Sequence, residues 1–349
     1  MTAASGKIRL ENAACPKCRR FDSRVVARGV DYLYAVPGNF VAAECASCGF
    51  WFQNPRPDRD SLPFLYPSTY APHQRTDDRS ADPALASLTE PYLRDHLGYD
   101  HRTAHTEASR GLRAVASRLW QKRRAGVALI PYYVPRGALL EIGCGNGERL
   151  QWLRRLGWHQ CRGIELVSTA AEQARAAGFQ VACGPVEDEL ARFPRNSFDV
   201  IIASMLLEHL YDPFSMVREI AERLKPGGEF LFSTVIRDSV DARMYGPYWS
   251  SFDFPRHMVY FRLADIHDML RGDFEDVERF HQNAPIDFVR SSSWREHGDN
   301  VLDRVIVACG QSVAGRVLGM VLARLGLTSR VSFRCRRRIP SQSEGRLKA

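Results

Sequence analysis

The sequence predicts an α/β protein organised around a doubly wound parallel sheet. Three observations support this prediction. A short apolar run at residues 138–142 leads into a glycine-rich turn and then into a helical pattern. Strand-like and helix-like segments alternate from there to residue 234. Two Cys-x-x-Cys pairs stand near the N-terminus, well before this alternation begins. We therefore expect a Rossmann-like domain with an added N-terminal module.

The glycine-rich turn is the most informative stretch of the chain. Gly143, Gly145 and Gly147 alternate after the strand, which lets polar groups of a ligand approach bare backbone and a helix N-terminus. Leucines then recur at helical spacing until a glycine ends the helix, at Leu150, Leu153, Leu156 and Gly157. A dinucleotide-binding turn has glycine or alanine at its sixth position, whereas Glu148 here would face a pyrophosphate. We expect a ligand without phosphate; the alternative is a glycine turn that binds no ligand.

Further strands and helices follow in alternation. Thr169 and Glu172 have the spacing of a capping box. Asp212 is expected to cap a later helix, with Pro213 at its first position. Strands are expected at residues 161–166, 179–183, 198–204 and 229–234, with a sixth at 276–281 and an antiparallel seventh at 330–336. In such a sheet, ligands bind at the carboxyl ends of the parallel strands.

The two cysteine pairs predict a metal-binding module. Each Cys-x-x-Cys forms a tight knuckle that directs two sulfurs at one point, and two knuckles give the tetrahedral S₄ coordination that suits Zn²⁺. The ligands would be Cys15, Cys18, Cys45 and Cys48. Segments 23–30 and 31–41 are expected to form hairpin strands between them. A closed S₄ site is structural rather than catalytic; the alternatives are unlinked thiols or a redox pair.

Composition and charge limit the classes of partner. The chain has 349 residues and a net charge of +8. Seven Arg or Lys and one Glu fall between positions 329 and 349, so the rest is near neutral and a nucleic-acid partner is not expected. We see no signal peptide and no apolar run of about 18 residues. Scattered cysteines favour a reducing cytoplasm.

Four motifs carry a resemblance to a known family. They are Glu-Ile-Gly-Cys-Gly-Asn-Gly from Glu141, Ser-Phe-Asp-Val from Ser197, Leu-Glu-His-Leu from Leu207 and Leu-Lys-Pro-Gly-Gly from Leu224. In this order and at these spacings they resemble class I S-adenosylmethionine (SAM) methyltransferases, above all the ubiquinone/menaquinone-type and sugar-type small-molecule group, over residues 136–280. The resemblance implies SAM as cofactor. Its sulfonium and amino groups are positive, so acidic neighbours suit it.

Cofactor contacts are expected along the strand ends. Glu165 ends the second strand, where a carboxylate can accept both ribose hydroxyls; the alternative is an exposed strand-end acid. Pro185 stands where the family often has the Asp that accepts the adenine amino group, so adenine contact would rely on Val186 or Glu187. The full set of expected cofactor-binding residues is Glu141, Gly143, Cys144, Gly145, Gly147, Glu165, Leu166, Val186, Glu187 and Ser204.

The acceptor is expected beyond the fifth strand. There, Trp249 could stack on an apolar or sugar-ring face, Arg256 could hold a phosphate or carboxylate, and His257 could act as general base. The alternative is a structural lid turn in which Arg256 pairs with a carboxylate. Other candidate bases are His209 and Glu208. Further substrate contacts are expected from Tyr66 and Tyr70, in a Tyr-Pro-x-x-Tyr run. This run, the cysteine module and the segment around Arg256 resemble a bacterial subset linked to glycan or secondary-metabolite assembly.

A helical insertion is expected at about 299–327. Its residues 312–325 form a weakly amphipathic helix, which by default packs on the core or on a second subunit. The alternative is peripheral contact with the inner membrane face, with Arg316 and Arg324 at lipid headgroups.

The expected organisation is a zinc ribbon at 1–60, a linker and helical lid segment at 61–130, a methyltransferase domain at 131–340 and a basic tail at 341–349. The expected function is SAM-dependent methyl transfer to a small-molecule, sugar or glycan acceptor, with oxygen as the methylated atom. One alternative is a zinc-ribbon ribosomal RNA base methyltransferase, which the near-neutral body of the chain disfavours. The other is a non-catalytic binding protein on the same fold.

Overall fold

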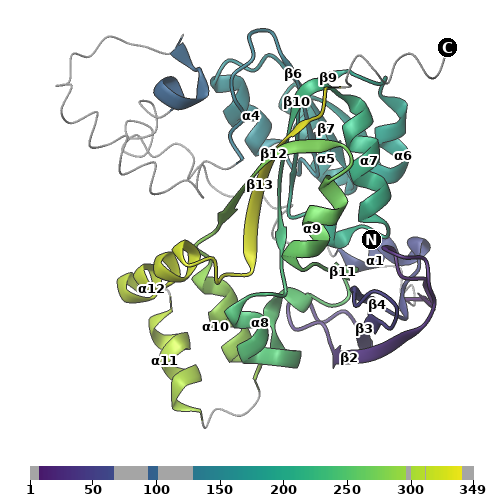
Figure 1. Ribbon diagram of the computed structural model, residues 1–349, viewed down its shortest axis with the longest axis vertical. Coiled ribbons are helices and arrows are strands. Elements are labelled where there is room, and N and C mark those ends of the chain that lie inside the picture. The colour runs from purple at the N-terminus through teal and green to yellow at the C-terminus, as the bar shows by residue number, and fades with distance from the viewer. Residues whose placement is uncertain (1–7, 67–92, 101–128, 296–299, 311, 340–349) are drawn as a thin grey trace.

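The computed structural model describes residues 8–66, 93–100, 129–295, 300–310 and 312–339 (Figure 1). Tyr70, most of the expected linker and lid segment, and the basic tail at 341–349 lie outside the described residues.

A seven-stranded sheet forms the centre of the molecule, in the order β12-β13-β10-β9-β6-β7-β8. Its strands are β6 (Ala138–Ile142), β7 (Gln160–Glu165), β8 (Gln180–Cys183), β9 (Phe198–Ser204), β10 (Leu224–Val235), β12 (Phe274–His281) and β13 (Arg330–Arg337). The five strands from β6 to β10 pair in parallel. Strand β13 runs antiparallel to both β10 and β12. The predicted doubly wound sheet and its antiparallel last strand are therefore confirmed.

Helices cover both faces of this sheet (Figure 1). They are α4 (Glu148–Arg155), α5 (Ser168–Ala176), α6 (Val186–Glu189), α7 (Pro213–Arg223) and α9 (Leu263–Leu270). Alternate residues of a strand point to opposite faces. Accordingly, Ile201 of β9 packs in the core with α6, α7 and α9, and Ile202 packs in the core with α4 and α5.

Two helix starts test the predicted caps. The Asp212 carboxylate accepts a hydrogen bond from the backbone N–H of Ser215 at 3.0 Å, and Pro213 opens α7, as predicted. Helix α5 differs, because it begins at Ser168 and no side chain caps it. The predicted capping box was wrong. Just before this helix, the Glu165 carboxylate accepts the N–H of Val167, which fixes the chain where it leaves β7.

A second sheet, in the order β11-β4-β3-β2, lies below the first (Figure 1). Its strands are β2 (Ser23–Gly29), β3 (Phe40–Cys45), β4 (Trp51–Gln53) and β11 (Val259–Tyr260). The predicted strand at 31–41 was wrong. Asp31 instead organises a loop by accepting the N–H groups of Leu33, Tyr34 and Val36. Strand β11 lies between β10 and β12 in sequence, just after residues 245–257, which we name the lid segment. The N-terminal module and the chain at the end of this lid segment therefore share one sheet.

The helical insertion lies at one end of the molecule (Figure 1). It comprises α10 (Pro285–Trp294), α11 (Val301–Cys309) and α12 (Val313–Arg324). Large apolar side chains of α11 and α12 are exposed, among them Val301 and Val313 at 71% and 78%. Among the described helices none is by itself long and apolar enough to cross a membrane, although α11 and α12 together meet that test across a 102° bend. Packing on a second subunit or on a membrane stays a prediction.

Candidate active site

A cavity of about 470 Å³ opens at the carboxyl ends of the parallel strands. This volume suits a small-molecule site. One end is lined by residues from the glycine turn and the following strand ends, including Gly143, Gly145, Glu165, Val186 and Ser204. The other end is lined by residues from the N-terminal part of the chain, the turn after β9, the segment between β10 and β11, and α10. They include Tyr34, Tyr66, His209, Asp253, His257 and Arg290. The cavity thus connects the expected cofactor end with the expected acceptor end.

The three glycines of the turn divide into two roles. Gly143, Gly145 and Gly147 have φ of 72°, 54° and 80°, a conformation that side chains disfavour. Gly143 and Gly145 line the cavity, as predicted for cofactor contacts. Gly147 does not line it; a Cβ there would come within 3.0 Å of the Ala174 side chain. Its role is close packing of α4 on α5.

Two further predicted cofactor residues lie behind the cavity wall rather than in it. Cys144 is buried, and its sulfur lies so close to Gly163 that a Cβ there would approach it to 2.5 Å. Glu141 is also buried and lies 3.5 Å from the Arg149 guanidinium. Burial raises the pKa of Glu141 to about 7. Both residues are buried behind the glycine turn, and neither lines the cavity. The structure therefore does not place them in direct contact with a ligand in this cavity.

Glu165 is fixed in position at the cofactor end. One carboxylate oxygen accepts the N–H of Gly145 and the other accepts the N–H of Val167, both at 2.8 Å. The side chain is buried yet lines the cavity. Each carboxylate oxygen has a second lone pair, so this arrangement fits a ligand with two neighbouring hydroxyls. Leu166, Val186, Glu187 and Ser204 also line the cavity, and their contact with a cofactor stays a prediction.

His257 is held in one tautomer at the acceptor end. Its Nδ1 lies 2.8 Å from the carbonyl oxygen of Ser251. A carbonyl can only accept, so Nδ1 carries the hydrogen and Nε2 of the neutral ring has a free lone pair. Nε2 lies 3.7 Å from a carboxylate oxygen of Asp253. His257 can therefore accept a proton at Nε2, and Asp253 would stabilise the resulting cation.

His209 lies beside His257, with ring centroids 4.6 Å apart. Its Nδ1 is 3.1 Å from the carbonyl oxygen of Arg256 and 3.2 Å from the hydroxyl of Tyr66. Loss of water around the ring, together with the neighbouring His257, lowers the pKa of His209 to about 3. Its imidazole is therefore a weak base, better suited to positioning Tyr66 than to accepting a proton.

Glu208 lies beneath the two histidines. One carboxylate oxygen accepts a hydrogen bond from the Thr234 hydroxyl at 2.7 Å, and burial raises the pKa of Glu208. Within the described part of the chain its other oxygen has no hydrogen-bond partner. Ligand atoms of Glu208, His209 and His257 lie within 4.8 Å of one another, so this cluster also has the composition of a divalent-cation site.

Two predicted substrate residues belong to the protein interior. Arg256 is fully buried, with one guanidinium nitrogen 2.7 Å from Asp31 and another 2.7 Å from Asp253. This matches the alternative of a structural lid turn. The two carboxylates occupy the guanidinium, so Arg256 has no free edge with which to bind an acceptor. Trp249 is 1% exposed, and its indole N–H donates to Asp241 at 2.9 Å. Neither residue is among those that line the main cavity.

The sequence analysis missed three residues of the acceptor end. Asp253 has a φ of 35°, and its Asp-Phe-Pro-Arg-His context could have indicated a turn that presents a carboxylate. Tyr34 comes from the loop organised by Asp31. Arg290 lies on α10 and gave no sequence signal. Tyr66 was predicted and lines the cavity.

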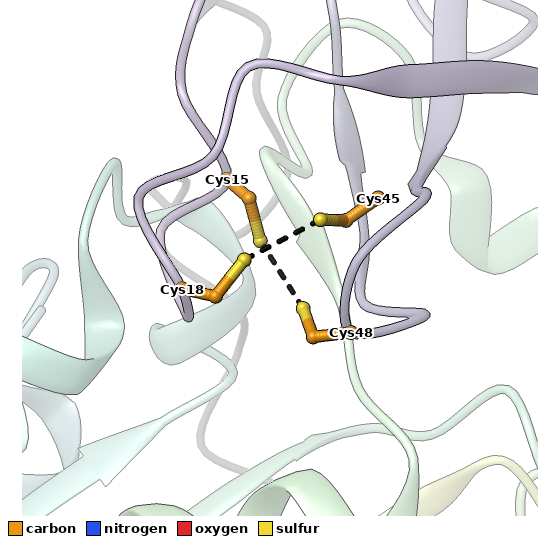
Figure 2. Close-up of side chains that lie close together, drawn as sticks. All are labelled: Cys15, Cys18, Cys45 and Cys48. Carbon is orange, nitrogen blue, oxygen red and sulfur yellow. Dashed lines mark hydrogen bonds between the residues drawn. The ribbon is translucent and has the colours of Figure 1, made fainter.

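Figure 2 shows the sulfurs of the four N-terminal cysteines turned toward one point. Sγ of Cys15 lies 3.6 Å from that of Cys48, and Sγ of Cys18 lies 3.4 Å from that of Cys45. A disulfide needs about 2.0 Å, whereas the edge of a tetrahedral ZnS₄ site is about 3.8 Å. Burial and the nearby Cys48 raise the pKa of Cys15, so a cation would be needed to hold this sulfur as a thiolate. The geometry fits one Zn²⁺.

Comparison with known proteins finds similarity over part of the chain. Residues 105–277 match the family model described as a methyltransferase domain. A ubiquinone biosynthesis O-methyltransferase of Neisseria meningitidis serogroup A is 35% identical over 104 residues, covering 28% of this chain and 43% of that protein. One from Escherichia coli O127:H6 is 31% identical over 157 residues, covering 40% and 65%.

Solved structures also align with part of the chain. A SAM-dependent methyltransferase from Archaeoglobus fulgidus aligns with a TM-score of 0.42 and 19% identity, covering 63% of this chain and 94% of that one. One from Mesorhizobium loti aligns with a TM-score of 0.42 and 18% identity, covering 62% and 97%.

Proposed function

We propose that the protein is a SAM-dependent methyltransferase that acts on a small-molecule acceptor, at oxygen. The observation that carries this proposal is one cavity that reaches from the glycine turn and Glu165 to His257. The methyltransferase domain at 105–277 and the named activity of the relatives support it. A sugar or glycan acceptor is a narrower form of the same proposal.

The cofactor end has groups that fit SAM. Gly143 and Gly145 present bare backbone, Glu165 presents a pre-oriented carboxylate for the ribose hydroxyls, and Val186 and Glu187 line the adenine side. SAM carries no phosphate, so the Glu165 carboxylate would not repel it as it would repel a dinucleotide. When bound, SAM supplies an electrophilic methyl group on a cationic sulfonium.

The acceptor end supplies the remaining requirement, which is removal of one proton. The acceptor hydroxyl loses its proton to Nε2 of His257 as its oxygen gains the methyl group. Ser251 fixes the tautomer that leaves Nε2 free, and Asp253 stabilises the imidazolium that forms. Positioned general bases of this kind contribute about 10²- to 10⁴-fold in rate.

We further propose that the four cysteines hold a structural Zn²⁺. The metal would fill all four ligand positions and so take no part in the chemistry. The N-terminal module supplies Leu33 and Tyr34 to the cavity wall, and its strand β4 pairs with β11. The metal would therefore maintain one side of the acceptor end.

The proposed activity is tested by incubating the protein with methyl-labelled SAM and fractionated cell extract. We expect label in the small-molecule fraction, on an oxygen atom by mass spectrometry. Label in RNA would support the base-methyltransferase alternative. SAM binding without transfer to any fraction would support the non-catalytic alternative.

A further inference from the structure

One cation at the acceptor end of the cavity has no partner among the residues that the structure describes. Arg290 lies on α10, is half-buried and lines the cavity. Within the described ranges its guanidinium makes no hydrogen bond or ion pair with another residue. Partial burial of a charge is unfavourable unless an opposite charge or a hydrogen-bond acceptor compensates it. The uncompensated charge of Arg290 on the cavity wall therefore indicates that a ligand supplies the missing partner.

The carboxylates around the cavity are already engaged elsewhere. Both oxygens of Asp287, one turn before Arg290, accept from Arg330 at 2.7 and 2.8 Å. Asp253 is bound by Arg256, and Glu165 accepts backbone N–H groups at the cofactor end. Glu187 also lies at the cofactor end, 3.9 Å from Arg59. Among the described residues, none of the carboxylates that line the cavity therefore pairs with the Arg290 guanidinium.

Helix α10 is held firmly, so Arg290 is presented from a fixed element. The Ser250 N–H donates to the Ser291 hydroxyl at 2.9 Å, and the Ser250 hydroxyl donates to the carbonyl of Asp287 at 3.1 Å. The Tyr245 and Ser292 hydroxyls are 2.6 Å apart. With the bidentate bond between Arg330 and Asp287, these contacts join α10 to the lid segment and to β13.

We propose that Arg290 is the recognition residue for an anionic group, a carboxylate or a phosphate, on the methyl acceptor. A planar guanidinium can bind either group through two parallel hydrogen bonds. The buried Arg256 cannot take this role, because Asp31 and Asp253 occupy it. This inference rests on the proposed function, and it narrows the acceptor to a small molecule with a hydroxyl at the His257 end and a negative charge at the Arg290 end.

The test uses the full chain and simple probes. Benzoate and phenyl phosphate are titrated by calorimetry in the presence of S-adenosylhomocysteine, with benzamide as the uncharged counterpart of benzoate. We expect the anions to bind and benzamide to bind at least about tenfold more weakly, since a charge-assisted pair is lost. Preference for benzoate assigns a carboxylate, and preference for phenyl phosphate assigns a phosphate.

Variants locate the binding. Arg290→Gln should weaken anion binding about tenfold or more while leaving benzamide binding unchanged, and Arg290→Lys should retain part of it. Arg316→Gln removes the same charge from an exposed position on α12, and should have no effect. If neither anion binds the wild type, or if Arg290→Gln binds both as tightly as wild type, the proposal is wrong. SAM binding measured on the same samples tests the proposed function separately.

Discussion

Replacement of His257 is the sharpest test of the proposed chemistry. His257→Ala removes the free Nε2, and His257→Gln keeps a hydrogen-bonding group but cannot take up a proton. His209 is the neighbouring imidazole, at 4.6 Å, but its pKa of about 3 makes it a far weaker base than an ordinary histidine near 6.5. We therefore expect no rescue, and a fall in kcat of about 10²- to 10⁴-fold in both variants.

The affinity for SAM should stay unchanged in both variants, because the cofactor end is formed by other residues. The assay measures initial rates with labelled SAM and the acceptor fraction that takes up label. His267→Ala, which changes an exposed histidine on α9, is the matched control. A wild-type kcat in both His257 variants would refute the general-base role.

The same assay decides between a base and a metal site at the cluster of Glu208, His209 and His257. If His257 accepts the proton, protein treated with EDTA and resupplied with Zn²⁺ alone should have an unchanged kcat. Loss of activity with EDTA, restored by Mg²⁺ alone, would instead assign the cluster to a divalent cation.

Three further predictions concern the N-terminal module and a residue on α9 that contacts it. Cys45→Ser should remove the single zinc found by elemental analysis, whereas the exposed Cys309→Ser should retain it; wild-type protein without metal would contradict the zinc site. Asp31→Asn should lower the free energy of unfolding by about 3 kcal/mol in urea denaturation, because it leaves a buried guanidinium short of charge; a loss as small as that of Glu44→Gln, whose partner Arg24 is exposed, would contradict this. Burial acts to raise the pKa of Asp265, but Arg262 and Lys17 outweigh it and hold that pKa below its ordinary value. Its contribution to stability is thus present above about pH 4 and lost as pH falls through the folded-state pKa, so Asp265→Asn should flatten the acid limb of urea stability; an unchanged limb would contradict this.

Signals that act over a few residues could be read from the sequence. The glycine turn, the Asp212 cap and the two cysteine pairs each depend on spacings of one to four positions, and the structure has all three features where they were predicted. The parallel sheet could be predicted as well, because strand and helix patterns alternate along the chain and such alternation is typical of parallel sheets. The position of Glu165 at the cavity could also be predicted, since it stands at the end of a recognisable strand.

Features that depend on distant partners could not be read in this way. Arg256 pairs with Asp31, which lies 225 positions earlier, and nothing local distinguishes a buried arginine from one that binds substrate. The β11–β4 pairing also joins segments that lie far apart in the sequence, since Val259 pairs with Phe52. Arg290 can be recognised as a candidate anion-binding residue only when the carboxylates that line the cavity are seen to be engaged by other groups. These are properties of tertiary packing, which periodicity and spacing do not encode.

The central claim is that this cavity binds SAM through the glycine turn and Glu165. Calorimetry with SAM on wild type and on Glu165→Ala tests it most directly, with Glu172→Ala on the exposed face of α5 as control. We predict that wild type and the control bind SAM alike and that Glu165→Ala binds it at least about tenfold more weakly, because charge-assisted hydrogen bonds are lost. Binding of NADH with no binding of SAM, or equal SAM affinity in wild type and Glu165→Ala, would contradict the account.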